Sequence, residues 1–300
     1  EFSESSVEFD HQNRMTGMSK KFQSSSMKMI EQFMLEANET VARHCVKRKL
    51  PALYRVHQPP SDLKLQQLKK TLAHYGVNPK TVSLSDSYGF SRILSHLKEL
   101  PQFEALQVVL LRSMALAVYQ TRNGGHFGLA AEFYTHFTSP IRRYPDLMVH
   151  RALKKELSSR NQKKSSRKRN VKQKHGEEID RELALKCSQQ ERNAEKAELQ
   201  SVDLMKCVFL EPHIGVDFQS IIRSLDSRQI RVELEPHTLE WNVPLETLND
   251  DRYFFDQERL YLSGRRQGRL IRIGQRLKLK LIRVDVLQRN IDFDFEGWLN

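Results

Sequence analysis

The stretch GHFGLAAEFYTHFTSPIRRYPDLMVHRAL, residues 125–153, decides how the middle of this chain folds. Pro140 disfavours a helical conformation at the residue before it, and Pro145 suits the first turn of a helix. Apolar residues then recur at helical spacing, so we expect a helix that ends near Leu157. The segment from Ser139 up to the second proline is therefore predicted to be a tight connection that leads into a helix N-terminus.

Two neighbouring arginines, Arg142 and Arg143, lie in this predicted connection. A guanidinium group pairs with phosphate through two parallel hydrogen bonds, and the amides of a helix N-terminus add partial positive charge. We therefore interpret the connection as a phosphate clamp. The alternative is that one arginine braces the helix through backbone carbonyls or Asp146, a residue that itself fits a helix-capping or dipole role. Further candidates for phosphate or RNA contact flank the arginines: His126, His136, Thr138, Ser139 and Tyr144.

Upstream of this stretch the apolar pattern predicts mainly helices, with serines in positions to cap them. The segments that we expect to be helical are 26–49, 61–76, 87–99 and 103–119. PALYRVH, residues 51–57, alternates in the way that strands do, and residues 1–25 are polar with one short strand expected.

Downstream, residues 154–174 hold ten lysines or arginines against one glutamate. Such a run is typical of a solvated, mobile loop, and the alternative is a tail that contacts RNA. A long charged helix is expected over 177–206. About five short alternating runs follow Cys207 and suggest a small closed barrel of the oligonucleotide-binding (OB) type. Its aromatic residues are expected to be core rather than a base-stacking platform: Phe218, Trp241, Tyr253, Phe254 and Phe255.

Composition narrows the class of partner. Hydrophobic residues make up 39% of the chain and the formal net charge is +12, which favours polyanions such as nucleic acid or an acidic membrane face. No apolar run is long enough to span a bilayer, and no signal peptide is visible. The three cysteines form neither a CxxC pair nor a zinc framework, which fits a reducing cytoplasm: Cys45, Cys187 and Cys207.

The stretch 125–153 closely resembles the signature of the ribonuclease II/ribonuclease R (RNB) family, and the bacterial ribonuclease R branch fits best. Further segments that share the resemblance are IEQFMLEANETVA (30–42), PALYRVHQPPSD (51–62), LLRSMALAVY (110–119) and CSQQERNAEKAE (187–198). The resemblance implies an α+β fold, in which a helix-rich part of an RNB catalytic domain precedes the OB-type barrel.

The resemblance also implies three parts for the chain. Residues 1–176 would be the C-terminal portion of the catalytic domain, with a flexible basic loop at 154–176. Residues 177–206 would be a connecting helix, and 207–300 a divergent RNA-binding barrel of the ribosomal S-one type. That barrel is expected to hold RNA weakly and mainly through charge, with these basic residues as candidates: Arg223, Arg265, Arg266, Arg269 and Lys278.

The family hydrolyses RNA processively from the 3′ end, releasing nucleoside 5′-monophosphates with magnesium held by clustered aspartates. On this resemblance the partner is single-stranded RNA and not a membrane. Arg142 matches the arginine that steadies the scissile phosphate, and Arg143 contacts a neighbouring phosphate or supports the loop. Glu31 falls where the family places a carboxylate near the RNA.

The family's aspartate cluster has no match in this sequence. Asp250 and Asp251 lie far downstream, and Asp292 and Asp294 alternate on a strand in the manner of solvent-facing residues. We therefore expect no metal site here, a chain that starts after the aspartates, and no RNA cleavage by these residues alone.

Two other interpretations stay open from the sequence. The first is a non-catalytic RNA-binding protein derived from the family. The second is that the basic loop docks on a ribosome or another RNA–protein particle, which only its charge supports.

Overall fold

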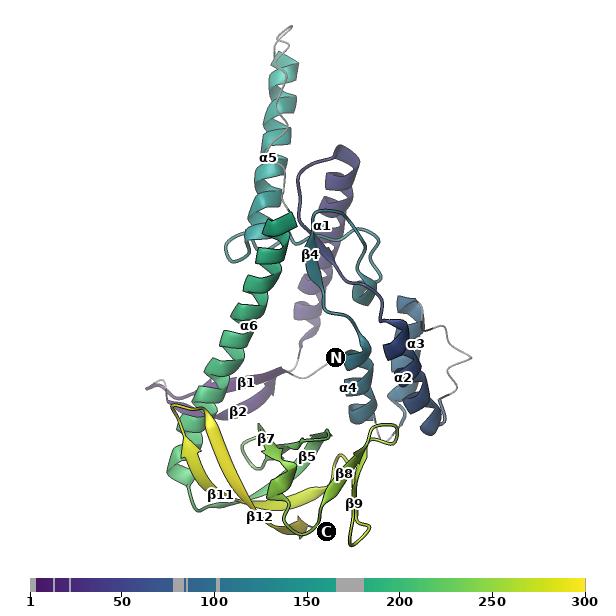
Figure 1. Cartoon of the computed structure of the whole chain (residues 1–300). Helices are drawn as coiled ribbons and strands as arrows, with labels where there is room; N and C mark the ends of the chain where they lie inside the picture. Colours follow the sequence, from purple (N-terminus) through teal and green to yellow (C-terminus); the bar gives the residue numbers. More distant parts are fainter. Residues whose placement is uncertain are drawn as a thin grey trace.

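The computed structural model describes residues 4–12, 14–21, 23–77, 84, 86–100, 103–165 and 181–299 of the chain. Helices dominate the first two thirds of the sequence and antiparallel strands the last third (Figure 1). The predicted mixture of helix and sheet is thereby confirmed. Within these ranges, no helix combines the length and the apolar character that a membrane span requires.

The first long helix, α1 (Ser25–Arg48), begins where the serines predicted it. The hydroxyl of Ser24 caps it by accepting a hydrogen bond from the Met27 amide, and Lys49 ends it in the left-handed conformation. A short strand, β3 (Tyr54–Val56), follows and pairs with β4 (Val118–Gln120).

Three shorter helices form a cluster of their own: α2 (Asp62–His74), α3 (Ser87–Leu97) and α4 (Phe103–Ser113). Leucines and aromatic residues from all three helices fill its core, and Leu260 of the C-terminal region joins them. The prediction that the last helix continues to residue 119 is wrong. Val118 and Tyr119 are good strand formers, and they pair with β3 instead of extending α4.

The N-terminus forms a hairpin of two strands, β1 (Glu4–Phe9) and β2 (Met15–Lys21), where one strand was predicted. The carbonyl of Met18 accepts a hydrogen bond from the Thr238 hydroxyl. Met18 is also buried in the core of the C-terminal sheets. The N-terminal hairpin therefore packs against the C-terminal region.

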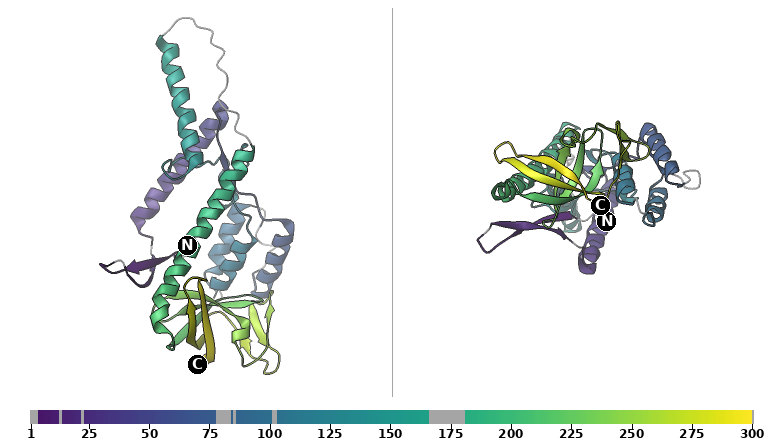
Figure 2. Two further views of the ribbon diagram at one scale, coloured as in Figure 1. Left: turned by 60° about the vertical axis from the view of Figure 1, so that its left-hand side comes forward. Right: turned by 90° about the horizontal axis from the view of Figure 1, so that it is seen from below.

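Helix α5 (Tyr144–Ser165) projects from the body of the molecule, and α6 (Arg181–Leu210) runs down to the sheets (Figures 1 and 2). The prediction of a loop from residue 154 is wrong as far as Ser165. Lysine, arginine, glutamine and glutamate are good helix formers, so the charge of this segment does not break the helix. Residues 166–176 of the predicted loop, and the expected start of the next helix at 177, lie outside the described residues.

Eight strands make up the C-terminal region: β5 (Asp217–Leu225), β6 (Gln229–Leu234), β7 (Leu239–Pro244), β8 (Tyr253–Asp256), β9 (Tyr261–Gly264), β10 (Leu270–Ile271), β11 (Arg276–Asp285) and β12 (Asn290–Leu299). They form a five-stranded sheet in the order β12-β11-β5-β6-β7 and a three-stranded sheet in the order β10-β9-β8. Neither sheet closes on itself in the part of the chain described, so the predicted closed barrel is not confirmed.

The aromatic residues of this region mostly behave as core. Phe218 and Tyr253 are buried, and Trp241 and Phe255 are half-buried against the same cluster. Phe254 departs from the prediction because 53% of its side chain is exposed. Alternation along β8 explains the difference, since neighbouring residues on a strand point to opposite faces.

Candidate functional site

The predicted connection before α5 is a tight turn. The amides of Arg142 and Arg143 both donate to the carbonyl of Ser139, at 3.3 and 3.1 Å. Ile141 and Arg142 lie on the outside of the turn with exposed side chains. The turn therefore presents one guanidinium group to solvent at the start of a helix, where backbone amides add positive character.

The second arginine of the pair is tied to the protein. Arg143 Nη2 lies 2.8 Å from Oδ1 of Asp146, whose side chain is fully buried. The same carboxylate oxygen accepts the Ser139 amide at 2.8 Å. Asp146 thus holds both ends of the turn, and its place in the first turn of α5 fits the predicted dipole role. Arg143 is therefore the arginine that braces the helix through Asp146. A contact between Arg143 and a phosphate stays a prediction.

A row of half-buried and buried rings lies near the turn, close enough for the charges of Arg143 and Arg142 to act on His136. The hydroxyl of Tyr119 lies 2.7 Å from Nδ1 of His136, and Tyr134 contacts the rings of both His136 and His126. His126 continues the row to His57, with ring centroids 5.0 Å apart. Flat, stiff side chains in contact leave little conformational freedom within this row.

The two histidines of the predicted site carry no charge near neutral pH. Burial, together with the charges of Arg143 and Arg55, lowers the pKa of His136 to about 3. Burial and the neighbouring His57 lower the pKa of His126 to about 4. Positive charge at the site therefore comes from guanidinium groups, and the imidazoles can contribute only as neutral hydrogen-bonding groups.

Asn38, which sequence reasoning missed, connects α1 to this row. Its Oδ1 accepts the Phe137 amide at 3.0 Å and its Nδ2 donates to the Tyr134 hydroxyl at 3.1 Å. Asn38 is 4% exposed. An asparagine on the buried side of an amphipathic helix was the available signal, because a buried amide needs partners from elsewhere in the fold.

Arg55 is the second residue that the sequence did not single out. Its guanidinium group hydrogen-bonds the carboxylate of Glu191 on α6 and lies over the Tyr119 ring, 4.9 Å from the centroid. A depression of about 340 Å³ opens beside this pair. Arg55 therefore links β3 to the long helix and places a second cation near the ring row.

The remaining predicted site residues occupy different surroundings. Thr138 and Ser139 are half-buried at the turn, and Tyr144 begins α5 with 49% of its side chain exposed. Glu31 lies on α1, where its carboxylate accepts a hydrogen bond of 2.7 Å from Gln23. The turn thus gathers Thr138, Ser139 and Tyr144 with the arginines, whereas Glu31 belongs to a separate helix.

Across the described residues, no group of three or more histidine, cysteine, aspartate or glutamate side chains is placed to hold a metal ion. Asp250 accepts hydrogen bonds from Tyr253 and Trp298, and Asp251 accepts the amides of Arg266 and Gln267. These carboxylates fasten turns and side chains within the fold. The described residues therefore do not fit a magnesium site.

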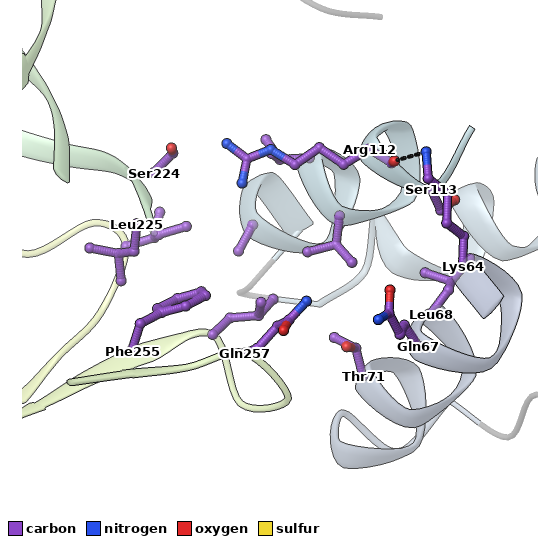
Figure 3. A pocket seen from close by; sticks show the side chains of 15 residues that line it. Lys64, Gln67, Leu68, Thr71, Arg112, Ser113, Ser224, Leu225, Phe255 and Gln257 are labelled. Carbon is purple, nitrogen blue, oxygen red and sulfur yellow. Dashed lines mark hydrogen bonds between the residues drawn. The ribbon is translucent and has the colours of Figure 1, made fainter. Parts of the chain in front are cut away.

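A separate cavity of about 250 Å³ lies between the three-helix cluster and the sheets (Figure 3). Phe255 and Leu225 form one wall and Leu68 the other. The ammonium group of Lys64 donates to two backbone carbonyls, those of Arg112 and Met114. This cavity is a gap in the packing between two modules, and it shares no residue with the turn at Arg142.

Comparisons with known proteins agree with the sequence resemblance. The model of the RNB domain family matches residues 1–159. Ribonuclease R of Aquifex aeolicus is 38% identical over 275 residues, which are 89% of this chain and 37% of that protein. Ribonuclease R 1 of Lactococcus lactis is 39% identical over 89% of this chain and 32% of its own length. The chain thus spans about a third of the length of the curated relatives it matches.

A solved structure matches almost the whole chain. Mycoplasma genitalium RNase R, solved in complex with ribose-methylated single-stranded RNA, aligns with a TM-score of 0.79 and 29% identity, over 98% of this chain and 45% of that one. The family match covers more than half of the sequence and includes the turn at Arg142. The chain therefore belongs to the RNB domain family, among whose members are the ribonuclease R proteins.

Proposed function

We propose that this chain supplies the phosphate-holding part of a hydrolytic 3′–5′ exoribonuclease, which degrades single-stranded RNA processively to nucleoside 5′-monophosphates. Arg142 clamps the scissile phosphate in this proposal. The observation that supports it is that the two arginines of the turn have different contacts. Asp146 fixes Arg143, so the neighbouring Arg142 is held on a stiff backbone while its guanidinium group remains exposed.

Rigid placement is what a phosphate clamp requires. A fixed backbone position keeps the guanidinium group close to where charge develops, and removing such a group costs on the order of a hundredfold or more in rate. Thr138, Ser139 and Tyr144 offer hydroxyl groups beside it. Neutral His126 and His136, with Glu31, complete the proposed RNA contacts.

The finer organisation is part of the same proposal. Residues 1–176 would be the C-terminal portion of the RNB catalytic domain, 177–206 the connecting helix, and 207–300 a divergent OB-type module that grips RNA through charge. Magnesium is the proposed cofactor, with ligands outside the described residues. The three cysteines are unpaired, which supports a cytoplasmic location.

A second function is a non-catalytic RNA-binding protein. The observation in its favour is that the described residues contain no cluster of metal ligands. Docking on a ribosome remains a third proposal, supported by the lysines and arginines that begin at residue 154.

The test uses the full-length gene product on a labelled RNA with a 3′ tail, in magnesium. Wild-type protein should release 5′-monophosphates, and Arg142→Ala should be at least about a hundredfold slower while it still binds RNA. Arg151→Ala, which removes an exposed arginine about two turns into α5, should retain activity. A wild-type protein that binds RNA and never cleaves it would favour the RNA-binding function instead.

A further inference from the structure

The cavity of Figure 3 lies between helices α2 and α4 on one side and strands β5 and β8 on the other. Direct contacts hold these two parts of the fold together beside it. Leu260 is buried in the core of the three-helix cluster, and Nε2 of His74 lies 2.9 Å from Oε2 of Glu258. The Tyr75 hydroxyl also donates to the carbonyl of Arg259. The walls of the cavity are therefore fixed relative to each other, as in a pre-formed binding site.

The lining of the cavity distinguishes it from an empty void, since unfilled voids in proteins are few and apolar. Two glutamines, Gln67 of α2 and Gln257 after β8, extend their amide groups toward each other from opposite sides (Figure 3). The ring of Phe255 and the side chain of Leu68 supply apolar walls. Apolar walls with a few convergent polar groups are typical of sites for small molecules.

One end of the cavity carries positive charge. Arg112 is exposed and extends its guanidinium group toward Ser224 (Figure 3), and among the described residues this group has no carboxylate partner. Lys64 is already engaged, because its ammonium group donates to the carbonyls of Arg112 and Met114 at 3.1 and 3.2 Å. The described residues that line the cavity include no aspartate or glutamate. The lining therefore suits an anionic group at Arg112 and offers a divalent cation no carboxylate ligand.

These features together match one class of ligand. A nucleobase is flat and stacks on aromatic side chains, and a glutamine amide reads the edge of adenine through two hydrogen bonds. A guanidinium group pairs with phosphate. The volume of about 250 Å³ lies just under the usual range of about 300–1,000 Å³ for ligand pockets, which suits one nucleotide and not an oligonucleotide.

We propose that the cavity binds adenosine 5′-monophosphate (AMP). The base lies between Phe255 and Leu68, its edge meets the amides of Gln67 and Gln257, and the phosphate pairs with Arg112 at the exposed end. The site is separate from the turn at residues 139–144, with which the cavity shares no residue. The proposal is therefore independent of the nuclease function, which depends on that turn.

Isothermal titration calorimetry of the full-length gene product, without RNA or magnesium, measures the Kd of AMP, of uridine 5′-monophosphate (UMP) and of adenosine. Two variants change the cavity, Gln67→Leu and Arg112→Ala. Their matched controls are Gln66→Leu, at the neighbouring exposed glutamine of α2, and Arg92→Ala, at an exposed arginine of α3; neither residue lines the cavity. Leucine and alanine are good helix formers, so all four variants should fold.

Wild type and both controls should bind AMP at least about tenfold more tightly than UMP. Gln67→Leu should abolish this preference for adenine. Arg112→Ala should weaken AMP binding at least about tenfold and leave adenosine binding unchanged, so that the nucleotide loses its advantage over the nucleoside. A general loss of structure would not separate the base from the phosphate in this way.

Four outcomes would overturn the proposal. The first two are absence of AMP binding by wild type and equal Kd values for the cavity variants and their controls. The third is AMP binding that Arg142→Ala abolishes and the cavity variants retain, which would place the nucleotide at the turn. The fourth is cavity-dependent binding of oligo(A) without binding of AMP, because the occupant would then be RNA.

Discussion

Arg143 and Asp146 form an ion pair of 2.8 Å at the start of α5, and the same carboxylate oxygen holds the amide of Ser139. This relationship gives two consecutive arginines different roles. Arg143 belongs to the structure of the turn, whereas Arg142 is exposed at its tip. The sequence alone could not separate them, because both have the same chemistry and adjacent positions.

Substitution of Asp146 by alanine should destabilise the protein much more than substitution of Arg142. Removing the carboxylate leaves the Ser139 amide and the Arg143 guanidinium group without their partner. We expect a loss of about 3 kcal/mol, at the lower end for a broken buried pair because Arg143 partly reaches solvent. Urea unfolding measures the difference. Arg142→Ala should change the free energy of unfolding by less than about 0.5 kcal/mol, and equal losses for the two variants would contradict this account.

Replacement of Asn38 by leucine should also destabilise the protein, although leucine suits a helix. The change removes the acceptor of the buried Phe137 amide and the donor to the Tyr134 hydroxyl. An unsatisfied buried group costs about 1–3 kcal/mol, so we expect a loss of at least about 2 kcal/mol. Asn193→Leu on the exposed face of α6 is the matched control and should have almost no effect. A similar Tm for both variants would show that Asn38 does not hold the row of rings.

Local signals predicted the helices and the turn well. The serine cap of α1, the apolar spacing of α2 and the two prolines around the arginines act within a few residues, so each could be read from the sequence. The end of α4 was missed because Tyr119 finds its partners far away, in β3 and at His136. Tertiary pairing overrides local helix propensity in such cases.

Long-range contacts explain the other differences. Asn38 and Arg55 were not predicted as site residues because the hydrogen-bond partners of their side chains lie 96 to 136 positions away in the sequence. The loop expected from residue 154 begins as helix, since the same lysines that suggested solvent exposure also favour helix. The alternation of apolar and polar residues after Cys207 predicted the presence of strands. It could not predict which strands pair, and the pairing decides whether a sheet closes into a barrel.

The two histidines near the arginines should make the protein sensitive to acid. Their pKa values are lowered in the folded state, to about 4 for His126 and about 3 for His136, whereas an unfolded chain protonates near its ordinary value of 6.5. The unfolded state therefore binds more protons below pH 6.5, and stability falls as pH decreases from about 6.5 to about 4 for His126 and to about 3 for His136. The expected loss is on the order of 2 kcal/mol for each histidine.

Unfolding in urea at pH 7 and at pH 4.5 tests this dependence. Glutamine at both positions keeps hydrogen-bonding groups but cannot titrate, so the double variant should lose clearly less stability between the two pH values than wild type does. Because the same carboxylates titrate in both proteins, the difference between them measures the contribution of the two histidines to the acid loss of stability. An identical acid loss in the variant and the wild type would show that other groups cause it.

The C-terminal module should bind RNA through charge rather than through bases. Arg265 and Arg266 are exposed in the turn after β9, which Asp251 holds in place by accepting the Arg266 amide. Each arginine that meets a phosphate of single-stranded RNA adds about 0.7 to the salt slope of log K, so alanine at both positions should reduce that slope by about 1.4. Filter binding to oligo(U) and oligo(A) over a range of salt concentrations measures it, and the loss should be equal for the two sequences. Arg283→Ala is the control, because Arg283 already pairs with Asp285 at 3.3 Å and should contribute less. A loss confined to one sequence would instead indicate that the turn reads bases.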